Sequence, residues 1–146
     1  MFLKRLLEYG VLWIVGGTLY FSIELLFRGF SHWTMFVLGG ICMMFFAFQG
    51  FSDPLWKQVL RSIVFVTACE FITGMIVNKF LGWNVWDYSK MPFHIMGQIC
   101  LPFTLLFTLL CIGGILLSAL SVFGICLSAY ILHWCFGEKK PNFHIV

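Results

Sequence analysis

The sequence predicts an all-α membrane protein, a polytopic helix bundle that forms a single integral membrane domain over residues 1–146. Two observations predict this fold class. First, 61% of the residues are hydrophobic and only 10% are charged, with a mean hydropathy of +0.97. A chain of this size cannot bury so much apolar surface in a water-soluble core. Second, the apolar residues fall into runs near the ~20 residues that a helix needs to cross a ~30 Å hydrocarbon layer.

The spans follow from these runs in order. The first three runs are each long enough for one transmembrane helix. The last stretch, Ile95 to Phe136, contains no Lys, Arg, Asp or Glu, and as one helix it would be about 60 Å long at ~1.5 Å per residue. We therefore expect it to fold back once, near Gly113-Gly114 or between Ser118 and Ser121, because small residues permit a tight turn. This gives five spans, at about residues 7–27, 32–51, 59–80, 95–115 and 118–136.

The segment GWNVWDYSKMPFHIMGQ, Gly82 to Gln98, interrupts the apolar pattern between the third and fourth spans. Pro92 disfavours a helix there. Non-helical backbone at membrane depth is tolerated only where it is buried in protein or lines a water-filled cavity. We therefore expect a short re-entrant segment or an interfacial cap. Trp83 and Trp86 suit the headgroup level of the bilayer, where aromatic rings are enriched.

Polar and small residues form a narrow stripe on the first span and another on the third. At ~100° per residue, each stripe covers an arc of about 80°, which indicates a face turned toward protein. Glu24 and Arg28 are one helical turn apart and can pair. The first stripe comprises Gly17, Tyr20, Glu24 and Arg28, and the second comprises Thr67, Glu70, Gly74 and Asn78.

Glu70 is the polar residue predicted to lie deepest, about 15 Å from the end of its helix and thus near the centre of the bilayer. An ionisable group at that depth costs on the order of 2.5 to 3.5 kcal/mol, so it normally faces the bundle interior and has a partner. Glu70 could share a proton with a polar neighbour or stay neutral. A functional role is favoured for Glu70, whereas Glu24 and Arg28 fit a structural ion pair equally well.

The two stripes and the Gly82 to Gln98 segment should meet at one face of the membrane, because the first and third spans run in the same direction. We expect Asp87, Tyr88, Asn84 and Gln98 to descend toward the stripes and supply hydrogen-bond partners. The candidate ligand-binding residues are therefore Glu24, Arg28, Glu70, Asn78, Trp83, Asn84, Trp86, Asp87, Tyr88 and Gln98.

Other residue types point to packing rather than chemistry. The six cysteines lie inside predicted spans without a CxxC pair, and no His or carboxylate cluster has metal-ligand spacing, so we expect neither a metal nor a cofactor. The formal charge of +3 is spread over short loops, which argues against a nucleic-acid partner. The pairs Gly16-Gly17, Gly39-Gly40 and Gly113-Gly114 are typical of close helix contact.

Several motifs also resemble a known family. YFSIELLFRGFSHWTMFVLGG, together with EFITG, VWDYS and GQIC, is similar to the CmpB-like family of type IV ABC-transporter permeases, bacterial integral membrane proteins to which a eukaryotic transmembrane family is related. The resemblance covers about Leu12 to Leu106. It implies a small multi-pass protein of the bacterial inner membrane with a transporter role. The signature positions are Glu24, Arg28, Glu70, Asn78, Asp87 and Gln98.

Three functions stay open at this point. The first is binding of a small polar or amphipathic ligand, with lipid as one candidate, in a cavity near one leaflet, for transport or sensing. The second is an intramembrane lipid-modifying enzyme with Glu70 and Asp87 as acid and base. No nucleophile elbow and no metal-ligand spacing supports the enzyme, which makes it the weaker of the two cases but leaves it open. The third is a non-catalytic structural subunit of a membrane complex, in which the polar cluster fixes helix register. A homodimer is also expected, because short spans bury little surface.

Overall fold

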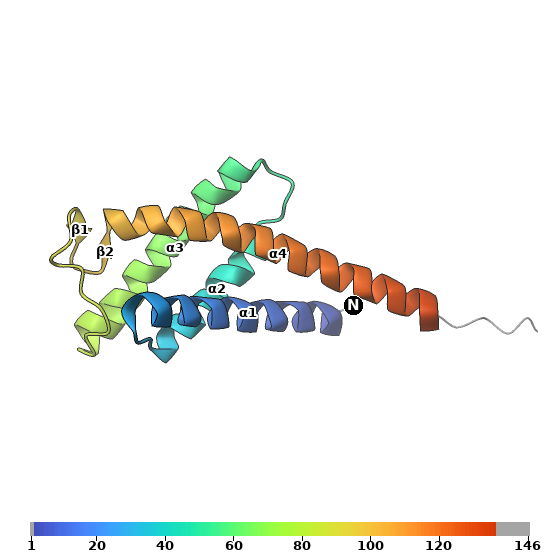
Figure 1. Cartoon of the computed structure of the whole chain (residues 1–146), viewed down its shortest axis with the longest axis horizontal. Helices are drawn as coiled ribbons and strands as arrows, with labels where there is room; N and C mark the ends of the chain where they lie inside the picture. Colours follow the sequence, from blue (N-terminus) through green and yellow to red (C-terminus); the bar gives the residue numbers. More distant parts are fainter. Residues whose placement is uncertain (1, 137–146) are drawn as a thin grey trace, which may run out of the picture.

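The computed structural model describes residues 2–136, and its described residues form an all-α bundle with one short β-hairpin (Figure 1). The predicted fold class is confirmed. A π-helical segment, η1 (Met75–Phe80), continues α3 without a break. The helices are α1 (Phe2–Arg28), α2 (Trp33–Phe48), α3 (Leu55–Gly74) and α4 (Leu101–Phe136), and the antiparallel strands are β1 (His94–Ile95) and β2 (Ile99–Cys100). Residue 1 and residues 137–146 of the expected domain lie outside this range.

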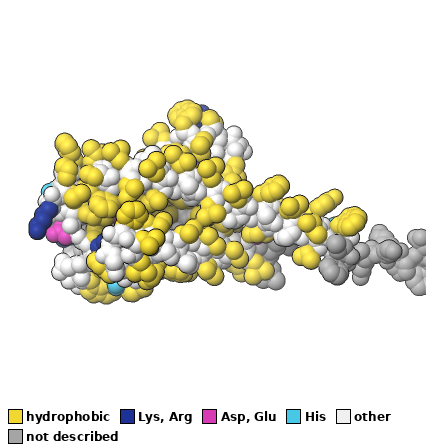
Figure 2. Space-filling model, viewed as in Figure 1, with side chains coloured by type: hydrophobic (Ala, Val, Ile, Leu, Met, Phe, Trp, Pro, Cys, Tyr) yellow, Lys and Arg dark blue, Asp and Glu magenta, His cyan; other side chains and the backbone are white. Residues whose placement is uncertain are grey.

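Three segments of the described chain are long and apolar enough to cross a membrane: Arg5–Arg28, Leu55–Phe80 and Leu101–Trp134. The apolar helix α2 is shorter, at 16 residues. Hydrophobic side chains cover most of the visible face, and charged side chains gather at the end that carries the hairpin (Figure 2). Such a surface is suited to lipid, because the hydrocarbon core contains no water and side chains that face it do not need to be polar.

The expected turn in the last apolar stretch does not occur. α4 continues for 36 residues through Gly113-Gly114 and through Ser118 to Ser121. The Ser118 and Ser121 hydroxyls donate to the carbonyls of Ile115 and Leu117 within the helix, at 3.1 and 2.9 Å. Small residues permit a turn but do not impose one. The prediction of separate spans at 95–115 and 118–136 is therefore wrong, since both belong to one helix that begins at Leu101.

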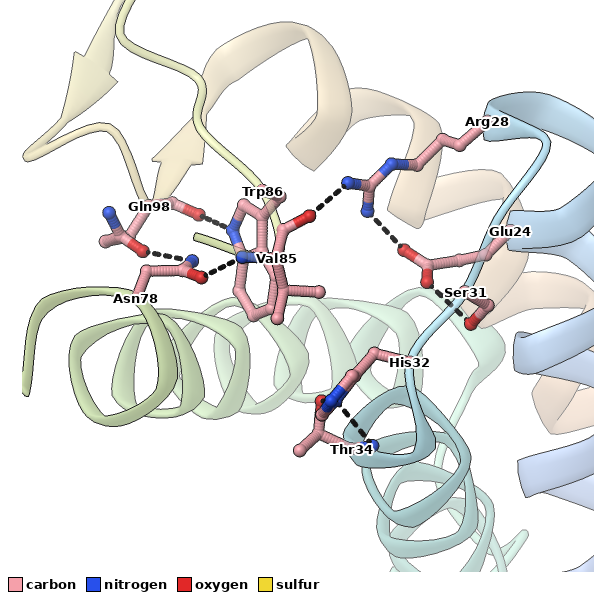
Figure 3. A network of polar contacts seen from close by, with 9 residues as sticks. All are labelled: Glu24, Arg28, Ser31, His32, Thr34, Asn78, Val85, Trp86 and Gln98. Carbon is pink, nitrogen blue, oxygen red and sulfur yellow. Dashed lines mark hydrogen bonds and ion pairs between the residues drawn. The ribbon is translucent and has the colours of Figure 1, made fainter. Parts of the chain in front are cut away.

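Local signals set where the first two helices end and begin. Gly29 follows α1 with a φ of +75° and donates its N–H to the Leu25 carbonyl at 3.0 Å, the usual way for glycine to end a helix. His32 caps α2, because its ring Nδ1 accepts from the Thr34 N–H (Figure 3). The short connection between these residues makes α1 and α2 an antiparallel pair.

Glycines hold α1 and α2 close together. A Cβ atom placed on Gly16 would lie 2.6 Å from the Gly39 carbonyl oxygen, and one placed on Gly39 would lie 2.6 Å from the Gly16 carbonyl oxygen. Gly17 and Gly40 meet neighbouring backbone and aromatic atoms just as closely. The predicted close contact is thus confirmed for these two pairs. Side chains at Gly16 or Gly39 would force the two backbones apart.

α1 and α4 run lengthwise along the molecule in opposite chain directions, and α3 crosses them (Figure 1). The end of α1, the end of η1 and the start of α4 therefore lie at the same end of the bundle, together with the hairpin, as the sequence predicts. The last turns of α4 extend past the other helices, and their large side chains are exposed. The buried core lies nearer the hairpin and is built from Met35, Leu38, Cys42, Met43, Phe46, Val66, Phe107, Cys111 and Ile115.

Candidate functional site

The residues between η1 and α4 form an ordered cap over the polar end of the bundle. The Tyr88 N–H donates to the Gly97 carbonyl at 2.8 Å, and this bond and the β1–β2 pairing hold the cap together. Gly97 has a φ of +71°, and a Cβ there would lie 2.6 Å from the Ser89 hydroxyl oxygen. Only glycine fits this place without strain. The predicted cap is thus a compact loop, packed on protein.

The two tryptophans of the cap lie in different surroundings. Trp83 is 48% exposed and contacts the rings of His32 and Trp33 at centroid distances of 5.4 and 6.3 Å, an arrangement suited to the headgroup level. Trp86 is only 4% exposed and donates its ring N–H to the Gln98 carbonyl at 3.0 Å. The expectation that Trp86 faces the headgroups is therefore wrong, because its ring is part of the core of the cap.

Asn78 joins the cap to η1 (Figure 3). Its side-chain amide donates to the Gln98 Oε1 atom at 2.8 Å, and its Oδ1 atom accepts from the Val85 N–H at 2.7 Å. Gln98 is 2% exposed and donates in turn to the Met96 carbonyl at 3.1 Å. Gly74 makes room for this pair, since a Cβ there would lie 2.5 Å from Gln98 Oε1. The glycine of EFITG therefore allows the amide pair to be buried.

Arg28 joins the cap to α1 (Figure 3). Its Nη1 atom donates to Glu24 Oε1 at 2.8 Å, and its Nη2 atom donates to the Val85 carbonyl at 2.8 Å. Glu24 Oε2 accepts from the Ser31 hydroxyl at 2.9 Å. The predicted Glu24–Arg28 pairing is confirmed. Both carboxylate oxygens of Glu24 and both terminal nitrogens of Arg28 thus have partners within the chain.

Glu70 differs from Glu24. It lies on the buried face of α3, one turn from Val66 and one turn from Gly74, and it is 4% exposed. Within the described residues, no hydrogen bond reaches its carboxylate, and the charged groups within electrostatic range of it are Glu24 and Arg28. Tyr20 and Tyr88 also lie within electrostatic range of Glu70. Glu70 is therefore enclosed beside the ion pair without being hydrogen-bonded to it.

Two adjoining cavities lie next to this cluster. The larger, about 230 Å³, is an apolar groove between α1, α2 and α4. The smaller, about 40 Å³, reaches Glu24 and Arg28 and is walled by Tyr88 and Phe103, whose rings stack at 4.7 Å. We call them the apolar groove and the polar pocket. Four side chains line both cavities, so the two are neighbours: Tyr20, Ile23, Phe107 and Leu110.

The structure brings seven of the ten candidate residues together and leaves three at the surface. Asn84, exposed, donates to the Gly82 carbonyl at 3.2 Å. Asp87, exposed, accepts from the backbone N–H and the hydroxyl of Ser89, which lower the pKa of its carboxyl. Because both are satisfied inside the loop, the expectation that they descend toward the stripes is wrong. The third is Trp83, and the seven clustered residues are Glu24, Arg28, Glu70, Asn78, Trp86, Tyr88 and Gln98.

Sequence reasoning did not include Tyr20 among the site residues. Tyr20 lines both cavities and lies within electrostatic range of Glu70 and Glu24. The signal was present, because Tyr20 is one turn before Glu24 in the polar stripe. Tyr88 faces the same space from the cap, and burial raises the pKa of its hydroxyl, so that it stays protonated. Both tyrosines therefore line the polar pocket together with Glu24.

Arg28→Lys should loosen the cap, although it keeps the positive charge. A lysine ammonium cannot match the flat two-nitrogen geometry that serves Glu24 and Val85 together. Losing one hydrogen bond at this partly buried pair should cost about 1.5 to 3 kcal/mol. Thermal unfolding of the detergent-solubilised protein, with protease sensitivity of residues 82–98, measures the effect.

Arg61→Lys is the matched control. Arg61 pairs with Asp53 at 2.7 Å, with side chains 46% and 43% exposed, and such surface pairs contribute little. Equal unfolding midpoints for the two variants would show that the Arg28 contacts do not stabilise the cap.

The chain is similar to one family of known proteins. A family model described as "Putative ABC-transporter type IV" matches residues 2–136. No curated protein and no solved structure gives a match.

Proposed function

The chain belongs to this ABC-transporter type IV family, and from that premise we propose that it binds a small amphipathic ligand in the two adjoining cavities as its part in transport. Family membership and the apolar helices already make it a membrane protein with a transporter-like role, embedded in a lipid bilayer. The proposal adds a ligand, with lipid as one candidate, and a place for it. It also places the whole chain as one domain in the bacterial inner membrane.

The observation that carries the proposal is the contact between the apolar groove and the polar pocket. Ligand sites in proteins are mostly apolar cavities with a few placed polar groups. Here the apolar groove supplies the wall, and the polar pocket supplies Glu24 and Arg28 at one end. A molecule with an apolar body and a polar head matches both parts at once.

The size of the groove limits the ligand. At about 230 Å³, it is smaller than the roughly 300 to 1,000 Å³ of sites that enclose a drug-sized molecule. It therefore suits one alkyl chain or a small ring system rather than a two-chain lipid. The polar end lies within the last turn of α1, near Arg28, which places the head of the ligand close to one face of the membrane.

A structural role accounts for part of the cluster but not for all of it. The cap is held in place by hydrogen bonds of Arg28, Asn78 and Gln98, as a scaffold would require. Glu70 takes no part in that network, and the cavities are not needed to hold the cap. Ligand binding is thus the function that uses the remaining features.

Gly113→Leu should block the site. Gly113 lines the apolar groove, and a Cβ there meets nothing within 4 Å, so a leucine can enter the groove without displacing backbone. Native mass spectrometry of the gently solubilised protein should show a bound amphiphile on the wild type. The variant should retain several-fold less, because the added side chain occupies the space that the ligand needs.

Gly124→Leu is the control for this measurement. Gly124 is on the same helix, also meets nothing within 4 Å, and does not line the groove. The two variants gain the same side chain and the same helix propensity. If both retain the amphiphile equally, or if the wild type carries none, the groove is not a ligand site.

A further inference from the structure

The charges around the polar pocket do not balance. Glu24 and Glu70 are two acids beside a single guanidinium, that of Arg28. Arg28 gives one nitrogen to Glu24 and the other to the Val85 carbonyl, and its guanidinium carbon lies 4.7 Å from the centre of the Phe30 ring. Its positive charge is therefore already matched. With both acids ionised, one negative charge is left over.

The unmatched charge belongs to Glu70. Both oxygens of Glu24 accept hydrogen bonds, from Arg28 and from Ser31. Glu70, at 4% exposed, receives none from any described residue. A buried carboxylate without a partner is costly, so its site needs either a proton or a cation. An anionic ligand would find less support here, since both terminal nitrogens of the one guanidinium already donate hydrogen bonds, to Glu24 and to the Val85 carbonyl.

The walls of the polar pocket also suit a cation. Aromatic rings attract a positively charged nitrogen through their faces. Tyr20 and Tyr88, which lie within electrostatic range of Glu70, both line the pocket. Other rings complete the wall, namely those of Phe27, Phe103 and Phe107.

We propose that the ligand is an amphipathic cation, an alkyl amine or quaternary ammonium, with its nitrogen beside Glu70 and its apolar body in the apolar groove. Glu70 itself lines neither cavity, but Val66, one turn before it on α3, lines the groove, so the acid lies directly next to the groove wall. This inference rests on the proposed function and names its ligand class. It makes Glu70 a site where a proton and an organic cation exclude each other.

Proton competition fixes the direction of the pH effect. The titratable and charged groups within electrostatic range of Glu70 are Tyr20, Glu24 and Arg28 of α1, Cys42 of α2 and Tyr88 of the cap. α4 brings no Lys, Arg, Asp or Glu, because its sequence contains none. As pH falls, Glu70 takes up a proton, the negative charge is lost, and the cation should bind more weakly.

Binding of octyltrimethylammonium tests the proposal. Its charge does not change with pH, so any pH dependence comes from the protein. Octanesulfonate, which has the same chain and a fixed negative charge, is the matched anion. Calorimetry with the protein in lipid nanodiscs, corrected with empty nanodiscs, should show the cation binding more tightly than the anion and weakening toward acidic pH.

Glu70→Gln should weaken cation binding roughly ten- to hundredfold and remove its pH dependence, as loss of a charged partner predicts. Asp87→Asn, at an exposed acid of the cap, should change neither. Glu70→Asp keeps the charge and should keep the pH dependence, which controls for a folding defect in Glu70→Gln.

The inference is overturned if Glu70→Gln binds the cation like the wild type, or if octanesulfonate binds as tightly. If octanesulfonate binds as tightly but Gly113→Leu prevents its binding, the ligand is not a cation, yet the proposed ligand site is still supported. If Gly113→Leu blocks neither probe, the proposed function itself fails.

Discussion

Gly39→Leu is expected to separate α1 from α2 and to leave little correctly folded protein. A Cβ on Gly39 would lie 2.6 Å from the Gly16 carbonyl oxygen and would collide with the Cβ atom of Tyr20. The Gly16 oxygen is a backbone atom and the Tyr20 Cβ is fixed by the backbone, so no side-chain rotation relieves either clash. Overpacking costs typically ~1 to 3 kcal/mol where side chains can adjust, and we expect a loss at or above the upper end. Size-exclusion chromatography and the thermal unfolding midpoint in detergent measure it.

Gly10→Leu on α1 is the control, because a Cβ at Gly10 meets nothing within 4 Å. This variant should elute and unfold like the wild type. The Gly39 variant should also lose ligand binding, since displacing Tyr20 changes both cavities. A Gly39 variant as stable as the Gly10 variant would contradict the close packing of α1 on α2.

Trp86→Ala is expected to be the most damaging single change in the cap. Trp86 is 4% exposed, its ring packs over Gly74, and its ring N–H donates to the Gln98 carbonyl. Removing such a ring typically costs about 3 to 5 kcal/mol, and it also leaves the Gln98 carbonyl without its donor. Hydrogen exchange of residues 82–98 should rise sharply, and the unfolding midpoint should fall.

Trp83→Ala provides the comparison within the same loop. Trp83 is 48% exposed and contacts other rings at the surface, so its loss should shift the midpoint far less. If hydrogen exchange in the cap rises equally in both variants, burial of Trp86 is not what orders the cap.

Much of the helical part could be predicted from the sequence, because hydropathy and helical period act locally. The stripes on α1 and α3 predicted that Glu24 would pair with Arg28 and that Glu70 and Asn78 would be buried, and the structure confirms this. Both stripes reach the same end of the bundle because connected helices alternate in direction. That inference needs no knowledge of side-chain contacts.

Two features could not be predicted, for different reasons. The first is the continuity of α4. A break was expected there because of its glycine and serine residues, which lower the cost of a turn without making the helix unfavourable in lipid. The cap depends on residues with positive φ, namely Asn84, Phe93 and Met96. Non-glycine residues adopt that conformation only when their surroundings hold them there, so the burial of Trp86 and the exposure of Asp87 follow from the folded loop alone.

The length of α4 has a consequence for how the protein sits in its membrane. The apolar part of this helix, Leu101–Trp134, has 34 residues, which is about 51 Å at ~1.5 Å per residue. A hydrocarbon layer of ~30 Å contains it only if the helix leans by more than 50°, beyond the tilts of up to roughly 40° seen for membrane helices. Either the bundle lies unusually inclined, or the surrounding acyl chains stretch to meet it, or one end of α4 leaves the hydrocarbon layer. Bilayer thickness therefore acts on this protein through α4, and it changes the angle at which the cap faces the water.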